Sequence, residues 1–289
     1  MTTQAKPVRT QRPTAKTRSP ERANPPTVLI TGASSGIGEA LAICFSQSGY
    51  DAILVARSVD KLSALRQRLK TEFGVTGHVL AADLAEPGAA DKLASAVARK
   101  KLTVDVLVNC AGVLHQGPFS SMTGATHQQM IDLNISGLTG MLAAFLPAMT
   151  RRAASGKTLR ILNVASIAAY QPVPMLATYA ATKAYVLSLG ESLAEELKEE
   201  GITVTTLCPG MTATAMLSNA AGGNSKISQI PSFMVGQVET VAQDAMDACL
   251  RGDAICVPGA VNQALVVGSR TAPKWLVRKI GGLLGRKVL

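Results

Sequence analysis

The residues best suited to do chemistry in this chain are Ser166, Tyr179 and Lys183. Tyr179 and Lys183 are four positions apart, and residues at that spacing share one face of a helix. A phenol has a pKa of about 10, so it exchanges protons near neutrality only when its anion is stabilised. An ammonium group one helical turn away stabilises that anion, because a nearby opposite charge favours the ionised form. With the Ser166 hydroxyl to orient the reacting oxygen, the trio suits proton transfer at a carbonyl or an alcohol.

The Tyr–Lys spacing is weak evidence by itself. Chance places such a pair in roughly one chain in five that has this number of tyrosines, and an exposed pair on an ordinary amphipathic helix would look the same. The order of the other motifs argues against chance, because each falls where a nucleotide-binding α/β sheet needs it. The elements that would position the trio therefore matter as much as the trio.

Short apolar runs alternate with helical periods from residue 27 onward. Continuous apolar strands separated by helices indicate a parallel sheet covered on both faces. We therefore expect an α/β fold of the doubly wound type, a three-layer sandwich with a seven-stranded parallel sheet, in one domain over 27–267. The predicted strands are 27–31, 51–56, 78–82, 105–109, 159–165, 202–208 and 254–257. The predicted helices are 37–48, 59–72, 87–100, 125–153, 178–200 and 238–251.

The net charge of +10 lies in the two ends of the chain. Residues 1–26 carry six Lys/Arg and one acid, residues 268–289 carry six Lys/Arg and no acid, and the body between them is close to neutral. A nucleic-acid enzyme would carry its basic patch on the body, so we expect no nucleic-acid partner. The five cysteines have no CxxC spacing and the three histidines are isolated, which indicates free thiols in a reducing, cytoplasmic setting and no metal site.

The turn after the first predicted strand reads Thr31-Gly-Ala-Ser-Ser-Gly-Ile-Gly38. Gly32, Gly36 and Gly38 would let the backbone turn tightly and approach a pyrophosphate at the helix N-terminus. A glycine-rich turn has this meaning only between a strand and a helix, and that is where this one falls. The turn therefore predicts a dinucleotide site.

Arg57, nineteen residues after Gly38, bears on the choice between NAD and NADP. An acid near this position would bind the ribose 2′-hydroxyl and repel a 2′-phosphate. A guanidinium suits a phosphate in charge and in forked geometry, so we expect NADP(H), although a surface arginine opening the next helix is the plain alternative. Asp83-Leu84 follows the third strand, where the acid can accept a hydrogen bond from the adenine amino group. Asn109-Cys-Ala-Gly112 ends the fourth, with Asn109, Ala111 and Gly112 where a bound ribose would lie.

Taken in order, these motifs resemble the short-chain dehydrogenase/reductase family over about residues 27–257. The family implies a Rossmann-type NADP-binding catalytic domain. It implies that Tyr179 is the general acid in reduction and the base in oxidation, and that Lys183 lowers its pKa and holds the nicotinamide ribose. Ser166 would bind the substrate oxygen, and Asn134 would anchor a water in a proton relay. The nicotinamide carboxamide would be held by Pro209, Gly210, Thr212 and Thr214, and the phosphates would be lined by Ser34, Ser35 and Ile37.

The resemblance also bears on one departure from the family pattern, on the substrate and on the assembly of subunits. Cys110 stands where the family has a second Asn, which we expect to alter packing more than binding. The Gly/Ser/Ala-rich interval 211–235 carries apolar residues where the family has its substrate lid, so a hydrophobic carbonyl or alcohol substrate is expected. Helices 125–153 and 178–200 would pair across subunits in a homodimer or homotetramer.

The two ends of the chain leave alternatives open. Residues 1–26 are rich in proline and have no apolar periodicity, which indicates a solvated tail. The basic segment 273–289, with the only tryptophan, would either contact an anionic membrane surface or pack against protein. The leading function is thus an NADP(H)-dependent ketone or aldehyde reductase. A membrane-associated reductase of lipid or 3-oxoacyl carbonyls and a non-catalytic NADP-binding regulator are the alternatives.

Overall fold

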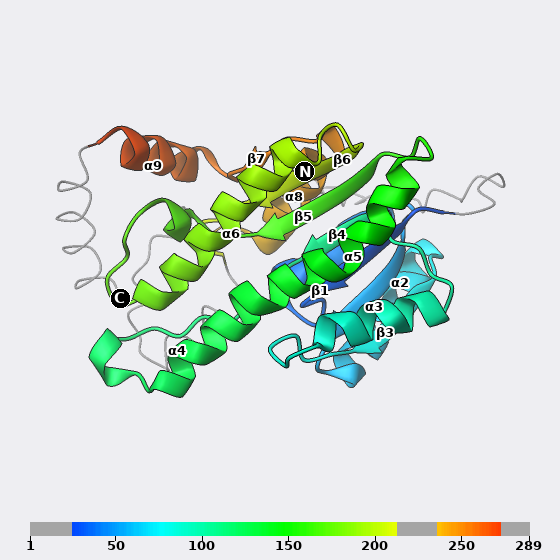
Figure 1. Ribbon diagram of the computed structural model, residues 1–289, viewed down its shortest axis with the longest axis horizontal. Coiled ribbons are helices and arrows are strands. Elements are labelled where there is room, and N and C mark those ends of the chain that lie inside the picture. Colours follow the sequence, from blue (N-terminus) through cyan, green and yellow to red (C-terminus); the bar gives the residue numbers. More distant parts are fainter. Residues whose placement is uncertain (1–24, 213–235, 273–289) are drawn as a thin grey trace, which may run out of the picture.

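The computed structural model describes residues 25–212 and 236–272. In this part of the chain seven strands, all parallel, form one sheet in the order β3-β2-β1-β4-β5-β6-β7 (Figure 1). The order reverses beside β1, which creates the crevice at the carboxyl ends of β1 and β4 where doubly wound sheets bind ligands. The strands are β1 (Thr27–Thr31), β2 (Asp51–Ala56), β3 (Gly77–Ala81), β4 (Val106–Asn109), β5 (Leu159–Val164), β6 (Ile202–Leu207) and β7 (Ile255–Cys256).

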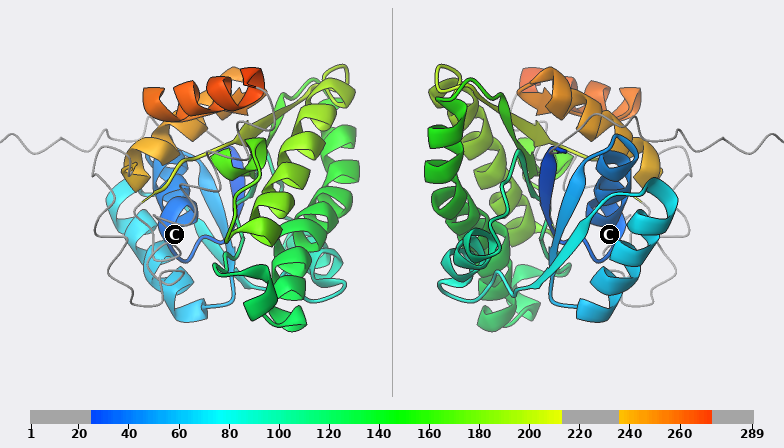
Figure 2. Two further views of the ribbon diagram at one scale, coloured as in Figure 1. Left: turned by 90° about the vertical axis from the view of Figure 1, so that its left-hand side faces the viewer. Right: turned by 90° about the vertical axis from the view of Figure 1, so that its right-hand side faces the viewer.

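Helices cover both faces of the sheet, so the expected three-layer sandwich is confirmed (Figure 2). One face carries α1 (Gly36–Gln47), α2 (Val59–Phe73) and α8 (Val238–Arg251). The other carries α3 (Ala89–Arg99), α5 (Leu138–Ala153) and α6 (Ala177–Glu196). Successive strand residues point to opposite faces of the sheet. Val28 and Ile30 pack in the first core, on the face covered by α1, α2 and α8, and Leu29 packs in the second core, on the other face. All three are fully buried, which explains why β1 reads as an unbroken apolar run.

The helix expected over 125–153 is interrupted. It is divided into α4 (Gly124–Ile131), the π-helical turn η2 (Asp132–Gly137) and α5. The apolar repeat continues through this turn, so the sequence indicates one continuous helix. The backbone instead changes there to the i→i+5 hydrogen bonds of a π-helix. Gly137 packs so closely that a Cβ there would lie 2.6 Å from the carbonyl oxygen of Leu84. π turns of this kind occur often at functional sites, and this one contains Asn134.

The same stretch, Gly124–Ala153, is long and apolar enough to cross a membrane by length and composition. Its α5 part packs Met141, Phe145 and Met149 against the sheet as part of the second core. A helix buried in a folded core explains the composition equally well, so this stretch does not argue for a membrane span.

A helix that the sequence did not indicate, α9 (Ala260–Thr271), follows β7. It runs past residue 267, where the folded domain was expected to end. Arg270 near its end lies 5.0 Å over the ring of Tyr170 and 3.3 Å from Glu191 on α6. Tyr170 belongs to the short 3-10 turn η3 (Ile167–Tyr170), so α9 is fastened to the segment that follows β5.

Candidate active site

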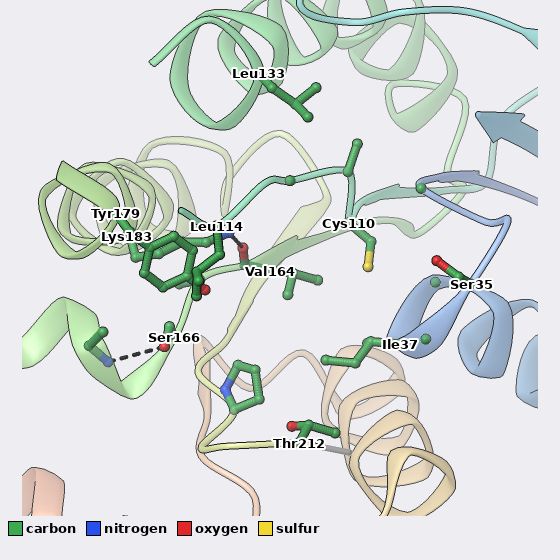
Figure 3. A pocket seen from close by; sticks show the side chains of 18 of the residues that line it. Ser35, Ile37, Cys110, Leu114, Leu133, Val164, Ser166, Tyr179, Lys183 and Thr212 are labelled. Carbon is green, nitrogen blue, oxygen red and sulfur yellow. Dashed lines mark hydrogen bonds between the residues drawn. The ribbon is translucent and has the colours of Figure 1, made fainter. Parts of the chain in front are cut away.

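A pocket of about 550 Å³ opens at the carboxyl edge of the sheet (Figure 3). Its volume lies within the range usual for cofactor and substrate sites. The glycine turn, Arg57 and Asp83 line one part of it, while Ser166, Tyr179 and Lys183 line another. The fold therefore brings together residues spread over more than 150 positions of the chain.

Two glycines of the β1–α1 turn lie too close to neighbouring backbone to be replaced. Gly32 has φ 70°, and a Cβ there would lie 3.0 Å from the backbone of Ala111. A Cβ on Gly38 would lie 2.3 Å from the Gly32 carbonyl oxygen, so α1 could not approach the turn so closely. Ser35 precedes α1 but its hydroxyl caps none of the helix N–H groups described here. The N-terminus of α1 thus faces the pocket with N–H groups open to an anion, which fits a pyrophosphate.

Thr31 fixes the turn to the neighbouring strand, a role that the sequence did not reveal. Its hydroxyl donates to the Val108 carbonyl and accepts from the N–H groups of Cys110 and Ala111, at 3.2, 2.9 and 3.1 Å. The carboxyl ends of β1 and β4 are therefore held side by side. The only sequence signal is a polar residue at the end of a buried strand.

Arg57 and Asp83, the two residues expected to read the adenosine end of a cofactor, pair with each other. Arg57 Nη1 lies 3.5 Å from Asp83 Oδ2, and the two side chains are 70% and 37% exposed. Both line the pocket. An exposed pair of this kind contributes about 0–1 kcal/mol, so an incoming phosphate can replace it at small cost.

Tyr179 and Ser166 meet in the interior of the pocket. Tyr179 lies on α6 and is almost fully buried, while Ser166 follows β5. The Ser166 oxygen accepts a hydrogen bond from the Ala168 N–H at 3.1 Å. The Ser166 hydroxyl hydrogen therefore remains available to a neighbouring oxygen, and Tyr179 is its hydrogen-bond neighbour.

Burial raises the pKa of Tyr179 to about 12, and the hydrogen bond from Ser166 opposes that rise. The sequence had led us to expect that Lys183 would lower this pKa. In the ligand-free protein burial outweighs the hydrogen bond from Ser166, and the expected effect of Lys183 on this pKa stays a prediction. Tyr179 is consequently a protonated acid at neutral pH.

Lys183 is buried beside Tyr179, with its Nζ 5.7 Å from the centre of the Tyr179 ring. The ammonium donates to the Val164 carbonyl at 2.8 Å, which directs it toward the end of β5 (Figure 3). Burial lowers the pKa of Lys183 to about 8. The group is mostly charged at pH 7, and its two remaining hydrogens are not used by Val164.

Asn134 lies behind the pocket wall. Its side chain accepts from the Val113 N–H at 2.8 Å and donates to the Val113 carbonyl and to Thr182 at 2.9 and 3.1 Å. A Cβ placed on Gly112 would lie 3.2 Å from Asn134 Oδ1 and 3.5 Å from Lys183 Nζ. The amide and the ammonium therefore approach the same side of Gly112, and a larger residue there would crowd Asn134 Oδ1.

Most predicted site residues meet at the pocket, with three exceptions. Asn134 is buried behind it, Asn109 is buried and donates to Asn163 Oδ1 at 2.9 Å, and Thr214 lies outside the described residues. The amide of Asn109 thus joins β4 to β5 and is not among the described groups that line the pocket. The predicted residues that do line it are Gly32, Ser34, Ser35, Gly36, Ile37, Gly38, Arg57, Asp83, Leu84, Ala111, Gly112, Ser166, Tyr179, Lys183, Pro209, Gly210 and Thr212.

Cys110 also faces the pocket, with its sulfur directed into it (Figure 3). Burial raises the pKa of its thiol to about 12, so it stays protonated. Beyond the trio, the pocket is lined by Leu114 and Gln116 after β4 and by Gln171, Pro172, Val173 and Leu176 before α6, and we call this part of its wall the substrate side. Of the interval expected to be a lid, 213–235 lies outside the described residues.

The family model for short chain dehydrogenase matches residues 26–224. Oxidoreductase UcpA of Salmonella typhimurium is 37% identical over 199 residues, which cover 68% of this chain and 72% of that protein. The NADPH-dependent pterin aldehyde reductase of Arabidopsis thaliana is 31% identical over 217 residues, 74% of this chain and 86% of that one.

Solved structures show the same likeness. A short-chain dehydrogenase from Sphingobium yanoikuyae in complex with NADPH has a TM-score of 0.74 and 33% identity, and the match covers 85% of this chain and 93% of that one. The chain belongs to the short-chain dehydrogenase/reductase family. It is an oxidoreductase that acts on CH–OH donors.

Proposed function

We propose that the protein interconverts a ketone or aldehyde and its alcohol with NADP(H), and that Tyr179 is the acid and base of the reaction. The observation that supports this most is the buried group of Ser166, Tyr179 and Lys183 in a pocket that also contains the glycine turn and Arg57. A cavity that contains both a proton donor and a glycine turn suited to a nucleotide suits hydride transfer coupled to proton transfer.

The residues present fit a dinucleotide. The open N-terminus of α1 suits the pyrophosphate, and the close approach of Gly32 and Gly38 leaves room for it. Asp83 and Leu84 would hold the adenine, Ala111 and Gly112 would lie against a ribose, and Pro209, Gly210, Thr212 and Thr214 would hold the carboxamide. When bound, NADPH supplies the hydride.

Each residue of the trio has a distinct task in reduction. The Ser166 hydroxyl, held by Ala168, donates to the carbonyl oxygen and orients it. Tyr179, protonated because it is buried, gives its proton to that oxygen as negative charge develops. Lys183 uses its free N–H donors for the ribose hydroxyls, and its charge stabilises the phenolate that remains. In oxidation the same phenolate accepts the proton of the alcohol.

The preference for NADP(H) over NAD(H) rests on Arg57. Its exposed guanidinium stands at the end of β2 on the wall of the pocket, where a 2′-phosphate attached to the adenosine would reach it. The structural relatives that bind NADPH or NADP agree with this choice, although other members of the family use NAD.

The apolar walls at Leu114, Val173 and Leu176 favour a hydrophobic carbonyl compound. Ketones and aldehydes of graded size would be supplied with NADPH, and the loss of its absorbance recorded. We expect turnover with at least one compound, and none in Tyr179→Phe, whose NADPH affinity should remain within a few-fold of wild type. Turnover that survives in Tyr179→Phe would contradict the assignment.

We further propose that the body of the chain, expected over 27–267 and extended by α9 to Thr271, is a single catalytic domain that acts in the cytoplasm and assembles as a homodimer or homotetramer. Segment 273–289, for which contact with an anionic membrane is the alternative, lies outside the described residues. Light scattering of the purified full-length protein measures its assembly.

A further inference from the structure

The segment just before α6 makes a tight turn with an unusual residue in it. The Leu176 N–H donates to the Val173 carbonyl at 3.1 Å, with Pro174 and Met175 between them. Met175 has φ 71°, a left-handed value that side chains with a Cβ disfavour. Proline cannot adopt a positive φ, so Pro174 followed by a positive φ defines a type II turn. That turn ordinarily has glycine or asparagine where this chain has methionine.

Met175 holds its carbonyl toward the opposite wall of the pocket. The Gly117 N–H donates to the Met175 carbonyl at 2.9 Å. Gly117 follows Leu114 and Gln116, which line the substrate side from the β4 direction, and Met175 lies between Val173 and Leu176, which line it from the α6 direction. This one backbone hydrogen bond therefore joins the two walls, and we call it the 117–175 tie.

A second contact fastens the same two segments further along. The His127 ring lies 2.8 Å from Thr178 Oγ1 and 3.2 Å from the Phe119 carbonyl, and it stacks on the Phe119 ring with 4.2 Å between centres. Thr178 immediately precedes Tyr179 on α6. The segment after β4 is thus attached both within the turn, at Met175, and just after it, at Thr178, close to the proton donor.

We propose that Met175 is a positioning residue, whose strained turn fixes the distance between the two substrate-side walls beside Tyr179 through the 117–175 tie. Backbone strain is retained where the surrounding structure requires that conformation, and such strain often accompanies a binding site. The Met175 side chain is not among the described groups that line the pocket, so its backbone carries the effect. This inference rests on the proposed carbonyl reductase function.

Both ends of the tie can be altered through backbone preference alone. Met175→Val places a β-branched residue at φ 71°, whereas Met175→Asn keeps a residue that tolerates it. Gly117 has φ 154°, and a Cβ there would meet no atom closer than Met122 Cγ at 3.9 Å. Gly117→Ala therefore has room for its methyl group and acts only by disfavouring this φ.

The experiment compares these three variants and the double variant with wild type. We expect Met175→Val and Gly117→Ala each to raise the KM for the carbonyl compound roughly three- to tenfold, as for the loss of one hydrogen bond, with little change in kcat or NADPH affinity. Met175→Asn should stay within about twofold of wild type. The double variant should resemble either single variant, because both remove the same bond.

Hydrogen exchange at the Gly117 amide in the ligand-free protein reports whether the 117–175 tie is formed, and it needs no substrate. Faster exchange in Met175→Val than in Met175→Asn is expected. Three outcomes would each overturn the proposal. The first is that the effects on KM multiply in the double variant, and the second is that Met175→Asn is as impaired as Met175→Val. The third is that KM stays unchanged although the Gly117 amide has lost its protection from exchange. If Met175→Val does not fold, the proposal is tested by comparing the KM and the Gly117 exchange rate of Gly117→Ala with those of Met175→Asn. A wild-type protein that reduces no carbonyl compound would instead overturn the proposed function, and the exchange data would stand.

Discussion

Arg57 and Asp83 form an ion pair on the wall of the pocket that is proposed to hold the adenosine, with 3.5 Å between Nη1 and Oδ2. Sequence reasoning gave each residue a separate partner in the cofactor. The structure shows that they are also partners of each other, so a bound phosphate must compete with Asp83 for the guanidinium. This competition leads to predictions about both residues.

Arg57→Asp should weaken NADPH binding roughly tenfold or more while changing NADH binding little. The substitution removes a charge-assisted contact, worth about 1.5–3 kcal/mol when formed, and places a negative charge beside the 2′-phosphate. Fluorescence titration with both nucleotides gives the ratio of affinities. Arg68→Asp on α2 is a matched control, since Arg68 is also exposed and pairs with Glu72. An unchanged NADPH/NADH ratio in Arg57→Asp would refute the phosphate role.

Asp83→Asn should increase the preference for NADPH over NADH about two- to fivefold. The amide keeps an acceptor oxygen for the adenine amino group but no longer neutralises Arg57, and an exposed ion pair of this kind is worth about 0–1 kcal/mol. The gain should shrink in high salt, because screening weakens exposed charges. Titration at two ionic strengths measures both effects, and a lower NADPH preference would contradict the competition.

Lys183→Met should make the protein more stable at pH 7 although it removes activity. Burial lowers the Lys183 pKa from 10.5 to about 8, so the folded protein holds this proton less tightly than the unfolded chain. The loss of folding stability that the buried charge causes is complete below pH 8, and it disappears as the pH rises toward 10.5.

We expect Lys183→Met to gain about 2 kcal/mol at pH 7, since the shift is worth ~3 kcal/mol and the lost bond to Val164 costs about 1. The gain should decline by pH 9.5. Urea unfolding at the two pH values measures it, with the exposed Lys92→Met as control. A gain that is the same at both pH values would show that the charge of Lys183 is not its source.

Alcohol oxidation should accelerate as the pH rises, and carbonyl reduction should slow at high pH. Oxidation needs the Tyr179 phenolate and reduction needs the protonated phenol, whose pKa burial raises to about 12 in the ligand-free protein. Ser166→Ala should move both profiles to higher pH, because the hydrogen bond from Ser166 lowers the Tyr179 pKa. The pH dependence of kcat in both directions tests this. Ser192→Ala, on the exposed side of α6, should leave the profiles in place.

Local pattern was sufficient for the strands, for most helices and for the Tyr179–Lys183 face. The strands appear as short unbroken apolar runs and the helices as a repeat of 3.6 residues, and the chain displays both directly. The glycine turn was equally readable, because Gly32 and Gly38 stand between a strand and a helix and few other residues fit there.

The π turn around Asn134, helix α9 and the left-handed Met175 were not readable in this way. The apolar period passes unbroken through Asp132–Gly137, α9 has few charged residues to mark its outer face, and a methionine gives no signal of positive φ. The side-chain amide of Asn109, a residue expected near the cofactor, donates to Asn163, its register partner on the neighbouring strand, and this pairing depends on the tertiary structure.

Sequence alone determined which groups are available for chemistry and in what order the sheet presents them, because residue type and spacing are properties of the chain. Tertiary structure decided their charge states and their partners. Whether Tyr179 is an acid, whether Lys183 holds its proton and whether Arg57 faces Asp83 depend on how much water each group loses and on which groups from distant segments replace it.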